Sequence, residues 1–175
     1  MFTEKTVRLN RIYEGKIVNL RRDDAVLPDG KPCVREVVEH PGGACVLCVR
    51  DGKVALVRQF RYAYGEELLE IPAGKLERGE DPLLAARREL EEETGLRTEK
   101  LNYLFTLYPS PGYSDEKIYV YEALNAEKTC QHLDEDEFLS VVYMSVEEAL
   151  EKIGNGEIKD AKTIAALLYY QNKKK

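Results

Sequence analysis

The segment from Asp81 to Gly95 limits the fold most strongly, because it carries both a start signal and a stop signal for a helix. Asp81 is a good N-cap residue and Pro82 suits the first helical turn, whereas Gly95 readily adopts the left-handed conformation that ends a helix. At about 100° per residue, one stripe of this helix should face a core, and it consists of Leu83, Ala86, Leu90 and Thr94. The sequence therefore predicts one amphipathic helix.

Short β-rich runs lie on both sides of this helix. Two apolar runs, residues 44–49 and 54–59, are joined by the turn sequence Asp51-Gly52, which predicts a hairpin of central strands. A further short strand is expected at residues 68–71, where the sequence Pro72-Ala-Gly74 stops it. After the helix, the remaining predicted strands are residues 101–108, 118–124 and 138–144.

Two helices are expected to finish the chain. The first begins with a capping box of Ser145 and Glu148 and stops at Gly154, and the second covers about residues 160–171. Strands followed by helices that must cover both faces of a sheet predict a mixed sheet in an α/β/α sandwich.

The N-terminal part of the chain has a different pattern. From Thr6 to Glu39, short β-rich runs alternate with turn signals, which predicts a small antiparallel sheet. We therefore divide the chain into an N-terminal β appendage, residues 1–40, and a second domain, residues 41–175.

The acidic balance of the chain restricts its partners. Its 175 residues carry a formal net charge of -6, so the average surface should repel nucleic acid and acidic membranes. Residues 1–20 lack the apolar core of a signal peptide, and no later stretch approaches a membrane span. We therefore expect a cytoplasmic protein with no nucleic-acid or membrane partner.

Cys45 and Cys48 have the spacing of a C-x-x-C pair, but they lie in the apolar run that predicts a buried strand. On a strand, residues three apart point to opposite faces, so these thiols are not expected to share a metal ion or to close a disulfide. We interpret them as small core residues.

The polar face of the predicted helix is rich in glutamate. Helical spacing places Glu89, Glu92 and Glu93 together beside the core stripe. It places Glu91 on the far side near Arg87, where we expect an ordinary solvated ion pair. Like charges this close repel each other by a few tenths of a kcal/mol per pair, roughly, unless a cation lies among them. Carboxylate oxygens suit Mg²⁺ or Mn²⁺. Taken alone, such a run is more often a solvated glutamate-rich surface than a metal site.

The residues around these glutamates decide between the two interpretations. Gly74 is followed by five residues, Glu80, seven residues and then the run from Arg88 to Leu96, Arg-Glu-Leu-Glu-Glu-Glu-Thr-Gly-Leu. This pattern resembles the complete signature of the Nudix hydrolases, with every fixed position filled. The resemblance implies the Nudix fold for residues 41–175 and the metal-dependent hydrolysis of a diphosphate that joins a nucleoside to another group.

The resemblance also implies roles for individual residues. The metal ligands are then the side chains of Glu89, Glu92 and Glu93 and the backbone carbonyl of Ala73, with Glu93 taking part in catalysis as well. The residues that orient the loop and helix are then Gly74, Glu80, Arg88 and Gly95. The implied cofactor is Mg²⁺, with Mn²⁺ as a possible replacement.

Segments outside this signature resemble the ADP-ribose pyrophosphatase subgroup. Pro111 stands fifteen residues after Leu96 in a Ser-Pro-Gly loop. Supporting segments are Val57-Arg-Gln-Phe-Arg61, Leu69-Glu-Ile-Pro-Ala-Gly74 and His132-Leu-Asp-Glu-Asp-Glu137. The resemblance implies that ADP-ribose is cut to AMP and ribose 5-phosphate. The alternatives are a hydrolase of another nucleoside diphosphate sugar and a non-catalytic module that binds ADP-ribose.

Candidate substrate contacts follow from the same resemblance. Arg58 and Arg61 can each grip two phosphate oxygens through a planar guanidinium. Further candidates are Glu70, Pro111 and Gly112. In such relatives the N-terminal sheet exchanges contacts within a homodimer, so Arg35 is a candidate to reach the partner's site.

The residue that activates water is expected in the acidic loop from Asp134 to Glu137. In similar enzymes a glutamate on a loop at this place serves as the base, and the sequence leaves both Glu135 and Glu137 as candidates. The tyrosine that stacks on the base of the substrate is equally open among Tyr13, Tyr62, Tyr64 and Tyr113.

Overall fold

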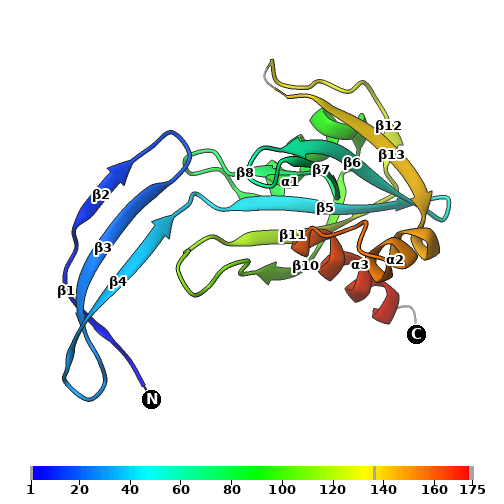
Figure 1. Ribbon diagram of the computed structural model, residues 1–175. Coiled ribbons are helices and arrows are strands. Elements are labelled where there is room, and N and C mark those ends of the chain that lie inside the picture. Colours follow the sequence, from blue (N-terminus) through cyan, green and yellow to red (C-terminus); the bar gives the residue numbers. More distant parts are fainter. Residues whose placement is uncertain (1, 136, 174–175) are drawn as a thin grey trace. The chain divides into compact units, whose positions relative to one another are not determined.

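The computed structural model describes residues 2–135 and 137–173 (Figure 1). The chain forms two compact units: an N-terminal unit of Met1–Gly42 with Tyr108–Lys117, and a main unit of Gly43–Leu107 with Ile118–Lys175. The loop Tyr108–Lys117 thus belongs with the N-terminal strands although it is remote from them in sequence. The boundary expected after residue 40 does not account for this loop and stays a prediction.

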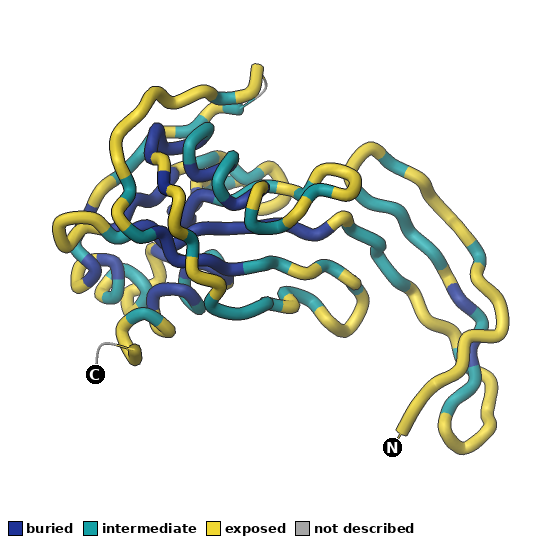
Figure 2. The backbone as a smooth tube through the Cα atoms, turned by 180° about the vertical axis from the view of Figure 1, so that it is seen from behind, coloured by how far each residue is buried: buried dark blue, intermediate teal, exposed yellow. Residues whose placement is uncertain are grey.

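The N-terminal unit is built on one antiparallel sheet, as the alternating pattern predicted. Strands β1 and β2 share one edge of β3, and β4 pairs with its other edge along the full length. Figure 2 shows exposed and half-buried positions along nearly all of this sheet. The bounds are β1 (Lys5–Arg8), β2 (Arg11–Glu14), β3 (Asn19–Val26) and β4 (Pro32–Glu39).

The main unit contains a seven-stranded mixed sheet with the strand order β10-β11-β5-β6-β13, while β7 pairs with β6 and β8 pairs with β5. Strand β11 runs parallel to β5 and the other pairs are antiparallel. The bounds are β5 (Gly43–Arg50), β6 (Lys53–Arg61), β7 (Glu66–Glu70), β8 (Ala73–Lys75), β10 (Lys100–Leu107), β11 (Ile118–Leu124) and β13 (Leu139–Ser145). Two short strands, β9 (Leu96–Arg97) and β12 (Glu127–Lys128), pair separately.

In the described residues, three helices accompany this sheet: α1 (Pro82–Thr94), α2 (Val146–Gly154) and α3 (Ala161–Lys173). The Asp81 side chain accepts from the first backbone amides of α1, and Gly95 ends the helix with a φ of 63°, so both predicted signals are confirmed. The predicted cap of α2 is also present, because the Glu148 amide donates to Ser145 at 3.0 Å. Within the described part of the chain, none of the helices combines the length and the apolar character needed to cross a membrane.

The sheet has a hydrophobic core on each face. On one face, Ala44, Val46 and Cys48 of β5 pack with Ala85, Ala86 and Leu90 of α1. On the other face, Cys45 and Leu47 pack with Ala149 of α2 and with Ala166 and Leu167 of α3. Figure 2 shows the buried positions concentrated along the central strands. The predicted α/β/α sandwich is therefore confirmed.

The two core layers also explain Cys45 and Cys48. The side chains lie in opposite layers, as the strand spacing predicted, and both thiols are free. Burial raises the pKa of Cys45 to about 12 and that of Cys48 to about 11, so both stay protonated at neutral pH. They behave as core residues.

The sequence did not predict β8. Pro72 was expected to stop the preceding strand, and β7 does end at Glu70, but the chain then pairs Ala73–Lys75 with β5. The carbonyl oxygen of Pro72 accepts from the Val46 amide at 2.9 Å and begins this second pairing. Proline removes only its own N–H, so the chain can change its partner strand at this point.

Candidate active site

The site begins where α1 packs on β8. Glu89 and Glu93 are buried on this side of the helix, with exposed fractions of 6% and 2%, and Glu92 is half-buried. The backbone amide of Ala73 donates to Glu93 Oε2 at 2.8 Å. The structure therefore brings together the four residues that the sequence predicted as metal ligands. The role of the Ala73 carbonyl stays a prediction.

Gly74 permits the close approach of helix and strand. A Cβ atom added to residue 74 would collide with the Glu89 carboxylate. Glycine is needed at residue 74 because a larger residue would occupy the space of the Glu89 carboxylate. This is a physical reason for the glycine at this position in the sequence pattern.

Arg88 organises the carboxylates from the helix side. Its guanidinium donates to both oxygens of Glu80, at 3.0 and 3.1 Å, which is a bidentate pair. Its Nη1 also donates to Glu89 Oε1 at 2.7 Å and to Glu92 Oε2 at 2.9 Å. The bond to Glu80 contributes most to the raised pKa of Arg88. Arg88 thus joins the loop before α1 to two of the predicted ligands.

The far side of α1 differs from the sequence prediction. Arg87 was expected to pair with Glu91, but its Nη2 donates to the carbonyl oxygen of Glu99 at 2.6 Å and its Nη1 lies 3.5 Å from the Glu99 carboxylate. The segment after α1 returns past the helix at this point, which local spacing could not indicate.

The charge of the site favours a bound cation. Burial raises the pKa of Glu89 to about 7 and that of Glu93 to about 8, although Arg88 and the Ala73 amide act in the opposite direction. A divalent cation would favour the ionised form of both groups, and carboxylate oxygens are suitable ligands for Mg²⁺ and Mn²⁺. The donor set therefore fits a divalent metal ion.

Among the residues that the structure describes, no three acidic, histidine or cysteine side chains already have a metal-binding arrangement. Arg88 holds one oxygen of Glu89 and one of Glu92. Each carboxylate has a second oxygen, so a metal ion has to use that oxygen or displace the guanidinium.

The loop after β12 lies across the C-terminal end of α1. The amides of Thr129 and His132 donate to the carbonyl oxygens of Gly95 and Glu92, at 2.8 and 3.0 Å. The Gln131 side chain donates to the Glu93 carbonyl at 2.6 Å. These bonds satisfy carbonyl groups that a helix end leaves unpaired. They also fix the start of the loop that contains the predicted base.

The two candidate bases have different surroundings. Glu137 is half-buried and acts electrostatically on both Glu89 and Glu93, raising the pKa of each. Glu135 is exposed. Asp136, which belongs to the same predicted loop, lies outside the described residues. Of the two candidates, Glu137 is thus the one within electrostatic reach of the metal-site carboxylates.

The two predicted phosphate contacts on β6, Arg61 and Arg58, also have different surroundings. Arg61 donates to both oxygens of Glu70, at 2.6 and 2.8 Å, and it lies within electrostatic reach of Glu93. Arg58 is exposed and acts electrostatically on Lys152 and Glu157. The structure brings Arg61 to the carboxylate site. The role of Arg58 stays a prediction.

The remaining predicted contacts lie in the N-terminal unit. Arg35 pairs with Glu4, at 2.6 and 2.8 Å. Pro111 and Gly112 are exposed, and the turn around them is closed by the Ser114 amide, which donates to the Ser110 carbonyl at 2.9 Å. Their roles in substrate binding stay predictions.

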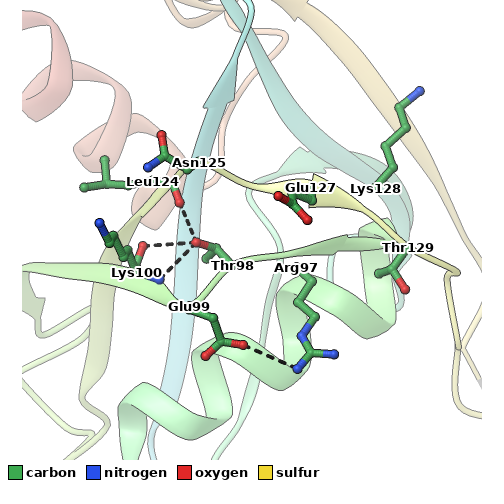
Figure 3. Close-up of a pocket in the computed structure, with 9 residues that line it drawn as sticks. All are labelled: Arg97, Thr98, Glu99, Lys100, Leu124, Asn125, Glu127, Lys128 and Thr129. Carbon is green, nitrogen blue, oxygen red and sulfur yellow. Dashed lines mark hydrogen bonds and ion pairs between the residues drawn. The ribbon is translucent and has the colours of Figure 1, made fainter.

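A separate pocket of about 430 Å³ lies at residues 97–100, 124–125 and 127–129 (Figure 3). None of the predicted site residues lines it. Its central hydroxyl, on Thr98, donates to the Leu124 carbonyl and accepts from the Lys100 amide at 3.0 Å. The polar groups at its centre satisfy each other, so we place the active site at the carboxylates.

Sequence reasoning missed three residues that support the site: Gln131, Asp160 and Lys162. Lys162 contacts Glu70 from α3 and is only 9% exposed. Its one sequence signal is a lysine near the start of a helix, where a solvated side chain is the usual interpretation. Only the fold reveals its partner.

Comparison with known proteins identifies related chains. A family model described as NUDIX domain matches residues 38–167, and one described as nucleoside diphosphate sugar hydrolase N-terminal domain matches residues 4–38. The chain is 45% identical over 173 residues to the ADP-ribose pyrophosphatase of Bacillus subtilis strain 168, covering 97% of this chain and 94% of that protein.

It is also 42% identical over 174 residues to the methanol dehydrogenase activator of Bacillus methanolicus, covering 98% of this chain and 94% of that protein. Among solved structures, the crystal structure of an ADP compounds hydrolase has a similar fold, with a TM-score of 0.85 and 20% identity. That match covers 97% of this chain and 93% of that chain.

The contact between Gly74 and Glu89 predicts how a methyl group added at residue 74 changes stability and metal binding. Gly74→Ala should lower the free energy of unfolding by about 1–3 kcal/mol, because the added Cβ forces the carboxylate or the strand to move. It should also weaken the binding of a divalent metal ion at these carboxylates. Denaturant unfolding and calorimetric titration with MgCl₂ measure the two effects. Gly154→Ala is the matched control, because nothing lies within 4 Å of its added Cβ. Equal behaviour of both variants would contradict the prediction.

Proposed function

We propose that this chain, which belongs to the Nudix hydrolase family, hydrolyses the diphosphate linkage of ADP-ribose to give AMP and ribose 5-phosphate. The observation that carries the proposal is the convergence of Glu89, Glu93, Glu137 and Arg61 on one site in the main unit. The 45% identity to an ADP-ribose pyrophosphatase over nearly the whole chain supports the choice of substrate.

The proposed cofactor is Mg²⁺, with Mn²⁺ as a possible replacement. The side chains of Glu89, Glu92 and Glu93 and the carbonyl of Ala73 would hold it. When bound, such an ion neutralises phosphate charge and acidifies a coordinated water. The oxygen donors and the partly buried setting of these carboxylates support this assignment.

The proposed chemistry of the protein's own side chains is acid–base catalysis and phosphate binding. Glu137 accepts a proton from the attacking water while a bond forms between the water oxygen and one phosphorus. The bond from that phosphorus to the bridging oxygen breaks, and the electron pair leaves with the second phosphate. Arg61 donates hydrogen bonds to phosphate oxygens and stabilises the charge on them.

The substrate assignment is tested by turnover of four compounds with Mg²⁺: ADP-ribose, ADP-glucose, GDP-mannose and UDP-glucose. We expect the highest kcat/KM for ADP-ribose, with AMP and ribose 5-phosphate as the products on chromatography. Faster cleavage of the guanine or uracil compound would mean that the substrate is another nucleotide sugar and not ADP-ribose. If the protein binds ADP-ribose without cleaving any of the four, the chain is a binding module.

The choice of Glu137 as the base predicts a difference between two otherwise similar variants. Glu137→Gln should lower kcat by a factor of about 10²–10⁴, because the amide cannot accept the proton from water. Glu135→Gln should keep kcat close to the wild-type value, since Glu135 is exposed and Glu137 is the candidate near the carboxylates. Steady-state kinetics and circular dichroism on both variants test this. The reverse order of the two effects would assign the base to Glu135.

We also propose that the protein is a homodimer that forms through its N-terminal sheet. Among the described residues, Ala25 is the only buried hydrophobic residue in strands β1 to β4. Large apolar side chains on these strands and their connections are exposed instead, namely Val7, Leu9, Ile12, Tyr13 and Ile17. A sheet with so little core of its own is stabilised when a second surface covers it. We place this dimer in the cytoplasm, where free thiols such as those of this chain persist.

A charge placed in the proposed dimer contact should separate the subunits. Ile12→Lys should give a monomer by size-exclusion chromatography with light scattering, whereas the wild type should give twice the chain mass. Leu84→Lys is the matched control, because Leu84 on α1 is 55% exposed and Ile12 is 58% exposed. A wild-type monomer, or a dimer that survives Ile12→Lys, would refute this contact.

A further inference from the structure

A buried ion-pair network connects the start of α3 with the proposed phosphate contact. The Lys162 ammonium contacts Glu70 Oε2 and lies 2.9 Å from Asp160 Oδ1. Glu70 in turn accepts two hydrogen bonds from Arg61. The network contains two cations and two anions, so its charges balance. Lys162 is 9% exposed and Glu70 is 2% exposed, so water screens their interaction little.

The two most buried members of this network, Glu70 and Lys162, are held in their charged forms. Burial alone would raise the pKa of Glu70, but Arg61 and Lys162 outweigh it, so this pKa lies below its ordinary value. Burial alone would lower the pKa of Lys162, but Asp160 and Glu70 outweigh it, so this pKa lies above its ordinary value. Removal of one cation would leave Glu70 with half of its charge compensation in a site with almost no solvent.

The network fixes the orientation of Arg61. Glu70 accepts hydrogen bonds from Nε and Nη2, which form one edge of the guanidinium group. This fixes the guanidinium plane and therefore the direction in which Nη1 points. The side chain of Arg61 is 38% exposed, so it is partly open to a ligand. Glu93 contributes to its raised pKa, after the larger contribution from Glu70, and therefore lies near it.

The backbone beside Glu70 is attached to the same turn of α3. The Ile71 amide donates to the Thr163 hydroxyl at 2.8 Å, and that hydroxyl donates to Asp160 at 2.5 Å. Asp160 also accepts from the Thr163 amide at 2.9 Å. One helical turn therefore holds both the side chain of Glu70 and the chain that leads to Ala73.

We propose that Lys162 is a positioning residue, which holds Glu70 so that Arg61 presents its guanidinium to a diphosphate bound at Glu89 and Glu93. This inference rests on the proposed function. In this role, Lys162 itself contacts neither the substrate nor the metal ligands. It acts through Glu70, and its contribution depends on the presence of Arg61.

The test is a double-mutant cycle on Lys162 and Arg61. Lys162→Met should lower kcat/KM for ADP-ribose about tenfold, mainly through a higher KM, because an incorrectly oriented Arg61 binds phosphate less tightly. Lys162→Arg should retain most of the activity. Arg61→Met should cause a larger loss, and the double variant should be no worse than Arg61→Met. If the two losses multiply, Lys162 acts independently of Arg61 and the proposal is wrong.

Lys173→Met is the matched control. It removes a lysine from the same helix and breaks an ion pair with Glu122 at 3.0 Å, far along α3 from Lys162. It should leave kcat/KM unchanged. An equal loss in Lys173→Met and Lys162→Met would mean that only the packing of α3 matters. Lys162→Gln replaces Lys162→Met in the cycle if the latter fails to fold.

A second measurement does not depend on turnover. The hydrogen bond to Glu70 should slow exchange of the Arg61 Nε–H with solvent, which NMR follows once the signal is assigned with Arg61→Met. We expect Lys162→Met to accelerate this exchange about tenfold, and Lys173→Met to leave it unchanged. Unchanged exchange in Lys162→Met would overturn the proposal. If the wild type fails to cleave ADP-ribose, the proposed function fails, but this exchange rate still decides whether Lys162 positions Arg61.

Discussion

The site depends on the burial of two carboxylates, Glu89 and Glu93, at the contact between α1 and β8. Moving a carboxylate out of water is costly unless other groups replace its hydration. Here Arg88 donates to Glu89 and the Ala73 amide donates to Glu93. The absence of a side chain at Gly74 lets the Glu89 carboxylate reach the strand. This contact sets the position of helix and strand together, and it concentrates negative charge where a divalent cation relieves it.

Two outer segments complete this arrangement. The loop after β12 satisfies carbonyl groups at the end of α1, and it continues to Glu137 near the two carboxylates. From α3, Lys162 holds Glu70, which fixes Arg61. In both cases a hydrogen-bonded support outside the site orients a side chain within it. These two supports, the loop after β12 and the start of α3, come from sequence regions that are remote from each other and from α1, so the site exists only in the folded chain.

The sequence predicted the local features well. The bounds of α1, its N-cap at Asp81 and its αL residue at Gly95 follow from backbone chemistry within one helical turn. The Asp51-Gly52 hairpin is confirmed for the same reason, because both residues have positive φ, 50° and 75°. Features that require a distant partner were missed or left open. Examples are strand β8, the pairing of Arg87 with Glu99, and the different surroundings of Glu135 and Glu137.

The sequence alone determined the α/β/α class, the clustering of Glu89, Glu92 and Glu93, and the family signature, because these depend on periodicity, caps and spacing within short segments. Tertiary structure alone decided which remote groups meet. Lys162 lies 92 residues from Glu70, and Gln131 lies 38 residues from Glu93. No local rule relates such positions, because their separation in space is set by how helices and strands pack on the two faces of one sheet.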